Sequence, residues 1–388
     1  MSRRIGLAVV ALCVAATAVL ALAGWPGRLY RDSDYVQYYA GSRALLEGQS
    51  PYDHAWWTEF HRRIGSEALS APPHTGDAAS DWTTPYPLWT FVALLPFAVF
   101  PLSVAEPLFA TVQVVLLVAA TLALGAVFLA RPRRDAPMAV ALVLASQPLW
   151  VLVAGGNVTG FATAAFTFAL ATLLAGRPRL AGLALAGCLI KPHLFALGAV
   201  VLVAAMPAAQ RARFVTGALA GALVLIVPAF IAQPGWVGDW LREAGRLQSS
   251  SASNATGWTI ARVFTTDFGP LSVLVVIACA AAFALWWWRV RPALPILVAG
   301  AMPVSVLVAP HGWSYDYIAL VPTVVAGVAL ASAARLRTLA LAFVALVAVV
   351  VPWVLYIVAF RRNGEDLSAL LLIAVEVAVI VSVRRGRA

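Results

Sequence analysis

The sequence has little charge, few cysteines and almost no lysine, and these shortages restrict the class of protein. Only 11% of its 388 residues are charged, against 62% hydrophobic residues, whereas soluble proteins carry about 25% charged residues. Cys13, Cys188 and Cys279 lie singly in apolar runs, where we expect them to pack as small hydrophobic side chains. The composition therefore excludes a soluble globular protein, and the cysteine spacing indicates no metal site.

Motifs for nucleotide chemistry and for common soluble enzymes are also missing. The chain has no Walker A sequence, no GxSxG, no Rossmann glycine pattern and no HExxH among its five histidines. The net charge of +10 does not indicate a nucleic-acid partner, because the arginines stand in short clusters between apolar runs. We therefore expect no nucleotide site, no metalloprotease and no nucleic-acid binding.

What the sequence does contain is a series of apolar runs near 20 residues long, the length of a helix that crosses about 30 Å of hydrocarbon. A closed β-barrel would show alternating segments of about 10 residues instead. With the basic clusters placed inside, we predict an all-α polytopic membrane protein of about 10–12 transmembrane helices with both termini cytoplasmic. One integral membrane domain would cover 1–388, with an uncleaved first helix over 5–25.

A long polar segment, 26–87, follows this first helix on the outside, and the rest of the bundle occupies 88–384. Prolines divide 88–130 into a short hairpin or partial span over 88–100 and a full span over 104–130. A run over 180–206 is broken in the middle, and 233–268 is a second outer loop. Single spans are expected over 137–154, 158–175, 214–232, 271–288, 294–308, 317–331, 339–360 and 367–383.

Lys191 is the only lysine among the 27 basic residues. Clusters expected inside flank 180–206 on both sides, so this run predicts two half-length helices that meet at Lys191-Pro192-His193 within the membrane. A charge in the membrane is by default a functional hypothesis, and an ammonium suits a phosphate ligand. The alternative is a structural lysine that reaches to the outer interface.

The segment 31–53, RDSDYVQYYAGSRALLEGQSPYD, places acids and tyrosines directly after the first helix. Asp34 begins a predicted interfacial helix over 35–47, whereas Asp32 adjoins an arginine. A carboxylate among aromatic rings at the membrane edge can have a raised pKa, which suits a general base. The alternative is that the carboxylate caps the helix.

Aromatic side chains accompany both polar regions. Tyr35, Tyr38 and Tyr39 share one face of the predicted helix, where they form either an interfacial aromatic belt or a surface for a sugar or a polyprenyl chain. Late in the chain, PHGWSYD at 310–316 places His311 and Asp316 on the same outer side. These two side chains would bind acceptor hydroxyls or assist proton transfer, although a histidine bonded to backbone is the alternative.

These segments together resemble glycosyltransferase family 87 of the GT-C superfamily, whose members use polyprenyl-phosphate sugars. DSDYVQYYAGSRALLEGQSPYD is similar to the family pattern D[FY]xxYYxAAxAxLxGxxPYD. TPYPLWTFVALLPFAVFP resembles the family's YPPL…LP helix, GGNVTGF its GQxN turn, CLIKPHLF its KPxxL break and APHGWSYDYIALVP its late SP…YD…LLP segment. The first pattern is matched at Asp34, Tyr35, Tyr38, Tyr39, Gly48, Pro51, Tyr52 and Asp53.

The resemblance implies a GT-C-type bundle whose long first outer loop carries short interfacial helices. It also implies inverting transfer of mannose, another hexose or arabinofuranose from a polyprenyl phosphate to a lipid-linked or cell-envelope glycan. Asp34 would be the catalytic base, Lys191 the contact to the donor phosphate and His311 a second catalytic residue. The substrate-binding residues would be Asp32, Tyr35, Tyr38, Tyr39, Tyr52, Asp53, Tyr86, Asn157, His193, Trp313, Tyr315 and Asp316.

No cofactor is expected besides the polyprenyl-phosphate co-substrate, with a divalent metal as an open alternative. The expected partners are membrane lipid, the donor, and a glycolipid or glycan acceptor. The protein would be multi-pass in a bacterial plasma membrane, with its site facing outside. A transporter or flippase for a lipid-linked or anionic substrate is the alternative function, because broken helices around a buried cation also mark transport sites.

Overall fold

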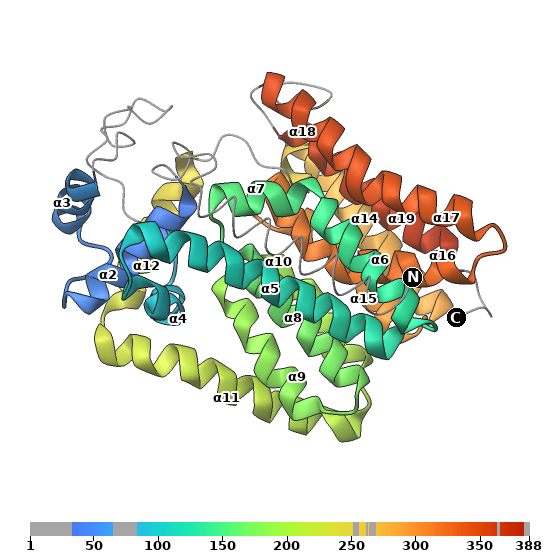
Figure 1. The fold of residues 1–388 in the computed structure, drawn as a ribbon, viewed down its shortest axis with the longest axis horizontal. Helices are drawn as coiled ribbons and strands as arrows, with labels where there is room; N and C mark the ends of the chain where they lie inside the picture. The colour runs from blue at the N-terminus through green and yellow to red at the C-terminus, as the bar shows by residue number, and fades with distance from the viewer. Residues whose placement is uncertain are drawn as a thin grey trace.

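The computed structural model describes residues 33–64, 84–250, 256–260, 263, 269–362 and 365–383. Every regular element in these residues is a helix (Figure 1). The described chain is therefore all-α, as predicted. The predicted first helix over 5–25, together with Asp32, lies outside the described residues.

The helices follow one another with short connections. The first part of the chain forms α2 (Asp34–Leu46), α3 (His54–Ile64), α4 (Leu88–Ala98), α5 (Leu102–Phe128), α6 (Pro132–Ala145), α7 (Gln147–Gly155), α8 (Thr159–Leu174), α9 (Pro178–Leu185), η4 (Ala186–Ile190) and α10 (Pro192–Ala205). The second part forms α11 (Ala208–Ala232), α12 (Trp236–Ser250), η5 (Gly257–Thr259), α14 (Gly269–Val290), α15 (Leu294–Val308), η6 (Ser314–Leu320), α16 (Val321–Ala333), α17 (Arg337–Ala345), η7 (Leu346–Val350), α18 (Val351–Arg362), η8 (Asp366–Ser368) and α19 (Ala369–Ser382).

Five helical segments of the described chain are individually long and apolar enough to cross a membrane. They are α5, α11, α14, the continuous η6–α16 segment and the continuous segment from α17 to α18, and the bent pair α6–α7 would make a sixth. Shorter apolar helices pack among them, and α15 lies in the centre, where it contacts α10, α14, α16 and α19. The described chain is thus a polytopic helical membrane protein, as the apolar runs predicted.

The predicted breaks in 88–130 and 180–206 are confirmed. The first region forms α4 and α5, separated at Pro101. In the second, η4 ends at Ile190, Lys191 has a non-helical backbone, and Pro192 begins α10. Proline is tolerated in the first turn of a helix because its missing N–H has no partner there. The chain therefore turns at Lys191 within an otherwise apolar stretch.

The prediction of a single straight span over 137–154 is wrong. The chain bends by 53° between α6 and α7, at Ser146. Pro148 has no N–H for the carbonyl oxygen of Leu144, four residues earlier, and the Trp150 indole N–H donates to that oxygen instead, at 2.9 Å. The bend directs α7 toward η6, where Gln147 Nε2 donates to the Ser314 hydroxyl at 3.1 Å.

The prediction that 233–268 is a loop is also wrong in its first part, which forms α12. Trp236 and Trp240 are one turn apart and both pack against Trp89 of α4, while Asp239 and Arg242 pair with each other on a more exposed side. An amphipathic helix of this kind interleaves apolar and charged residues. It therefore contains no long apolar run, and a search for such runs does not detect it.

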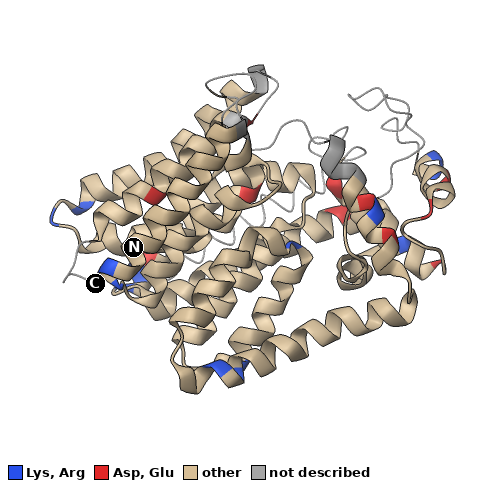
Figure 2. Cartoon of the chain, turned by 180° about the vertical axis from the view of Figure 1, so that it is seen from behind, with Lys and Arg blue, Asp and Glu red and all other residues tan. Residues whose placement is uncertain are grey.

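Polar helices gather at one end of the molecule. In Figure 1, α2, α3 and α12 lie together beyond the ends of the long apolar helices. Acidic side chains are concentrated on these helices (Figure 2), whereas the arginines in the turns before α6, α9, α11 and α17 lie toward the opposite end. This separation agrees with the alternation of inner and outer turns that the basic clusters predicted.

Candidate active site

Side chains from four distant segments meet in one hydrogen-bonded network, which we call the Asp34–Lys191 network. Asp34 is the first residue of α2, and Asn157 lies in the turn between α7 and α8. Lys191 stands at the break before α10, and Asp316 belongs to η6. Hydrogen bonds join Asp34 to Asn157, Asn157 to Lys191, and Lys191 to Asp316. The fold therefore brings together residues that the sequence singled out one by one.

Asp34 has one carboxylate oxygen bound and the other available. Its Oδ2 accepts hydrogen bonds from Asn157 Nδ2 at 2.6 Å and from the Tyr315 hydroxyl at 3.3 Å. No described residue donates to Oδ1, and the side chain is half-buried. Burial raises the pKa of the carboxyl above its ordinary value, while the Asn157 hydrogen bond and the charge of Lys191 act in the opposite direction.

The local backbone explains why this carboxylate is free to point into the network. Ser33 occupies the position before α2, and Asp34 is already the first helical residue. The carboxylate bonds across to α7–α8 and η6 rather than to the backbone N–H groups of its own helix. The helix-cap alternative for Asp34 is therefore wrong.

Lys191 is almost fully buried, with 3% of its surface exposed. Its ammonium donates to Asp316 Oδ1 at 2.5 Å, to Thr159 Oγ1 at 3.0 Å and to Asn157 Oδ1 at 3.2 Å. The same nitrogen lies 5.1 Å from the centre of the Tyr315 ring. A buried charge needs close partners of this kind, so the lysine points into the protein and the interfacial alternative is wrong.

The polypeptide before Lys191 is held by a tryptophan from α4. Trp89 Nε1 donates to the carbonyl oxygen of Leu189 at 2.8 Å, a group that a continuous α-helix would have bonded internally. Lys191 then takes φ −144° and ψ 65° before α10 begins. These contacts fix the point at which the ammonium enters the network.

The segment before η6 supplies the opposite side of the network. Asp316 is fully buried, and its Oδ2 accepts the backbone N–H of Trp313 at 3.0 Å. The Trp313 indole N–H donates to His311 Nε2 at 3.1 Å, which assigns the proton of a neutral imidazole to Nδ1. Burial and the nearby charge of Lys191 lower the pKa of His311, so the neutral imidazole is favoured.

Three further predicted residues border the network. His193 follows the break, and no described residue hydrogen-bonds to its buried Nε2. The rings of Tyr38 and Tyr86 meet edge to face with their centroids 4.7 Å apart. The charge of Asp34 contributes to the raised pKa of both tyrosines, after their burial. All three therefore lie close enough to the network for a substrate there to meet them.

Tyr35 and Tyr39 face the protein interior, with 1% and 7% of their surfaces exposed. The Tyr35 ring packs against Phe109 of α5 with the centroids 4.4 Å apart. The Tyr39 hydroxyl donates to the carbonyl oxygen of Phe100. These contacts hold α2 against the α4–α5 region, so the alternative of an aromatic belt facing lipid is wrong. A role of either ring in substrate binding remains a prediction.

Tyr52 and Asp53 shape the chain beside the network. The Tyr52 hydroxyl donates to the carbonyl oxygen of Tyr86 at 2.8 Å. Asp53 Oδ1 accepts the backbone N–H of Ala55 at 2.9 Å, at the start of α3. In the described residues both side chains are thus used for local structure, and their substrate contacts also remain predictions.

The structure adds two residues that the sequence reasoning did not select. The Thr159 hydroxyl lies 2.8 Å from Asn157 Oδ1 and 2.5 Å from Asp316 Oδ1. Its position two residues after an asparagine is a recognisable turn signal, so it was within reach of sequence analysis. Glu365 accepts the backbone N–H of Ser314 at 2.6 Å, and no local pattern links that residue to η6.

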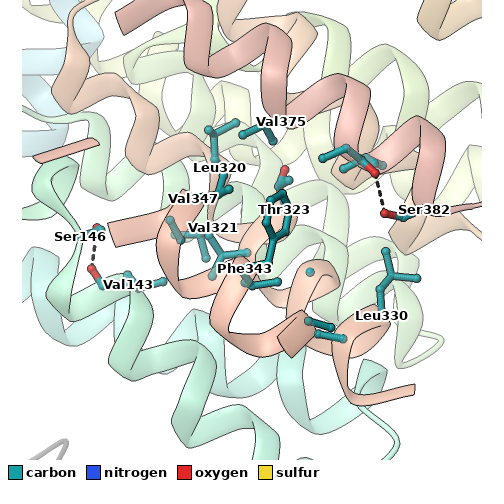
Figure 3. Close-up of a pocket in the computed structure, with 18 of the residues that line it drawn as sticks. Val143, Ser146, Leu320, Val321, Thr323, Leu330, Phe343, Val347, Val375 and Ser382 are labelled. Atoms are coloured by element: carbon teal, nitrogen blue, oxygen red, sulfur yellow. Dashed lines mark hydrogen bonds between the residues drawn. The ribbon is translucent and has the colours of Figure 1, made fainter. Parts of the chain in front are cut away.

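A largely apolar groove with a volume of about 640 Å³ begins beside η6 and follows α16 (Figure 3). Ser146 and Tyr317 line one end, while Arg335 and Ser382 line the other. Between these ends the walls come from α16, α17, η7 and α19, with Val324, Gly327, Leu330, Phe343, Val347 and Val375 among the lining residues. The groove therefore starts next to the segment that carries Asp316 and extends along the bundle.

The described residues contain no group of three or more His, Cys, Asp or Glu side chains arranged to hold a metal ion. The chemistry available at the network is that of a carboxylate, an ammonium, neutral imidazoles and hydroxyls. Independence from a metal remains a prediction.

Comparison with protein families gives a match to the model of glycosyltransferase family 87 over residues 82–310, which is more than half of the chain. The matched region includes Asn157 and Lys191 and ends just before His311. The comparisons with curated proteins and with solved structures gave no match. The family match supports sugar transfer and not the transporter alternative. This helical membrane protein therefore belongs to glycosyltransferase family 87.

Proposed function

We propose that the protein transfers a sugar, mannose or another hexose, from a polyprenyl phosphate to a lipid-linked or cell-envelope glycan. The observation that carries this proposal is a carboxylate with one free oxygen, joined through a single amide to a buried ammonium. The end formed by α2, α3 and α12 would face the outside of a bacterial plasma membrane, and the arginine-rich turns would face the cytoplasm.

Asp34 is the general base in this proposal. The acceptor hydroxyl donates a hydrogen bond to the free Oδ1, and its proton passes to Asp34 as its oxygen attacks the anomeric carbon. The bond from that carbon to the phosphate oxygen breaks on the opposite face, and its electron pair leaves with the phosphate. One displacement of this kind inverts the anomeric centre. A carboxyl with a raised pKa suits the role, since a base is most effective when its pKa lies near the working pH.

Lys191 would stabilise the charge of the departing phosphate. A phosphate oxygen would replace one of the three oxygens that now surround Nζ. A fixed ammonium in surroundings that exclude water stabilises developing negative charge much more strongly than one in solution. His193 and His311 lie on the same side and could supply N–H donors to the same group.

The groove beside η6 offers a place for the polyprenyl chain. A hydrocarbon chain gains about 0.8 kcal/mol for each CH₂ group buried, and large apolar cavities in proteins stay dry and bind apolar molecules. Because the groove begins at Tyr317, directly after Asp316, a lipid could extend along α16 with its phosphate near the network.

The proposal is tested with purified protein in lipid vesicles, supplied with labelled polyprenyl-phosphate sugars and lipid extracts. Asp34→Asn should lower the transfer rate by about 10²- to 10⁴-fold, the usual contribution of a general base, without changing Tm. Glu59→Gln is a matched control, because Glu59 is an acid on the outer surface of α3 that pairs with arginines. Full activity of Asp34→Asn would contradict the base assignment, and no product from any polyprenyl donor would contradict the donor class.

A further inference from the structure

Asn157 makes hydrogen bonds at both ends of its side-chain amide. Its Nδ2 donates to Asp34 Oδ2 at 2.6 Å, and its Oδ1 accepts from Lys191 Nζ at 3.2 Å. The same Oδ1 also accepts from the backbone N–H of Thr159 at 3.0 Å. One rigid, planar group therefore connects the carboxylate of the proposed base to the ammonium of the proposed phosphate site.

The orientation of this amide is fixed by its neighbours. A flipped amide would point its carbonyl oxygen at the Asp34 carboxylate and its NH₂ group at the Lys191 ammonium, so both contacts would become repulsive. The backbone holds the residue as well, because Asn157 N–H donates to the carbonyl oxygen of Leu152 at 3.2 Å and Gly156 turns the chain with a φ of +65°. The side chain is fully buried, which leaves no atom free to contact a substrate.

We infer that Asn157 is a positioning residue, which fixes Oδ2 of Asp34 so that Oδ1 faces the acceptor and which sets the base at a constant distance from Lys191. This inference rests on the proposed function of Asp34 and Lys191. It replaces the expectation that Asn157 binds substrate. A donor to a carboxylate also stabilises its ionised form, so Asn157 keeps the base able to accept a proton.

The other groups that face Asp34 must be considered in any pH experiment. Lys191, Asp316 and Tyr315 act on its carboxyl, and Asp34 in turn acts on Tyr38 and Tyr86. Tyrosine ordinarily ionises near pH 10. Near neutral pH the charged members of the set are therefore the two aspartates and Lys191, and only Asn157 and Tyr315 donate hydrogen bonds to Asp34.

The decisive variant is Asn157→Asp, which has almost the same shape but replaces the Nδ2 donor by an oxygen. The new carboxyl would compete with Asp34 for a proton, so the acidic limb of the kcat/KM profile should move to higher pH. At a fixed pH on that limb, the rate should fall about 10- to 100-fold, as expected for loss of a hydrogen bond to a charged group. Raising the pH should restore much of this loss.

Tyr315→Phe provides a second measurement if Asn157→Asp folds poorly. It removes the longer hydrogen bond to the same oxygen of Asp34 and should move the limb in the same direction by a smaller amount. Thr163→Val is the matched control, because Thr163 is buried one turn after Thr159 on α8 and no described residue bonds to its hydroxyl. This control should keep the wild-type rate and pH profile.

A loss of rate in Asn157→Asp that is the same at every pH would overturn the inference, since a purely structural residue or a substrate contact behaves in that way. An unchanged pH profile would overturn it as well. If the wild-type protein transfers sugar from no polyprenyl donor, the proposed function itself fails, and the inference fails with it. An active wild-type enzyme with a pH-independent defect in the variant refutes only the inference.

Discussion

At the scale of single residues, the network joins side chains whose charges would be costly to bury alone. Lys191 and Asp316 are both nearly inaccessible and lie in direct contact, and Thr159 and Asn157 fill the remaining hydrogen-bonding positions of the ammonium. Removing one member of a buried pair typically destabilises a protein by about 3–5 kcal/mol. Tests of function at this site must therefore separate folding from binding.

Lys191→Met should raise the apparent KM for the polyprenyl donor by about 10- to 100-fold, because a phosphate loses its charged hydrogen bond. The double variant Lys191→Met/Asp316→Asn removes both charges, so it should fold better than the single variant and still show the raised KM. Arg211→Met, which removes a cation at the start of α11, is the control. An unchanged donor KM in the double variant would show that Lys191 has a purely structural role.

Wild-type transfer should lose activity on the acid side at a pH above the ordinary aspartate pKa of 3.8. Burial raises the pKa of Asp34, and a base works only in its deprotonated form, so the rate falls as the pH drops through that raised value. A pH profile of kcat/KM measures the position of this limb. A profile that stays flat down to pH 4 would be incompatible with Asp34 as the base.

Sequence reasoning found Asp34 and Lys191 because an acid after the first helix and a lone lysine in an apolar run are both unusual. It did not find their connection. Which oxygen of Asp34 stays free depends on Asn157 and Tyr315, and these residues are separated from Asp34 by more than a hundred positions. Contacts of that range leave no periodic pattern in the sequence.

At the scale of elements, the site is made from helix ends and breaks rather than from helix interiors. Asp34 begins α2, Asn157 separates α7 from α8, and Lys191 separates η4 from α10. The Lys-Pro-His break was predictable, because proline and a charge coincide in an apolar run. The bend at Ser146 was not predicted, since a proline inside an apolar run is also compatible with a continuous membrane helix.

Gly156→Ala should destabilise the protein by about 2–5 kcal/mol and reduce transfer. The residue has a φ of +65°, and a Cβ there would lie 2.6 Å from Tyr35 Cβ, so left-handed strain adds to overpacking. Gly155→Ala is the matched control, because a Cβ at that position meets nothing within 4 Å. Thermal unfolding of both variants measures the effect, and equal Tm values would contradict the strain argument.

At the scale of the whole molecule, the apolar runs and basic clusters predicted an all-helical bundle with its acids at one end, and the described residues have that arrangement. The amphipathic helix α12 was not predicted, because its tryptophans alternate with charged residues. The groove was not predictable either, since it arises between α16, α19 and the segment from α17 to α18, whose packing the sequence does not specify.

Gly327→Phe should reduce use of long-chain donors more than use of a donor with two isoprene units. A side chain at 327 points toward Val344, across the groove, so phenylalanine would occupy the space of the chain. Val224→Phe on the exposed surface of α11 is the control. Competition between long and short donors in one vesicle preparation measures the ratio, and an unchanged ratio would place the chain elsewhere.

The outer wall of the groove is the segment from α17 to α18, and only 6% of its apolar window is buried inside the protein. A lipid that occupies the groove would therefore arrive sideways from the bilayer and never pass through water. The quantity that controls its binding would then be its mole fraction among the surrounding lipids, not its amount per volume of solution. Adding inert lipid or detergent at constant substrate would dilute the donor in two dimensions and raise its apparent KM in proportion.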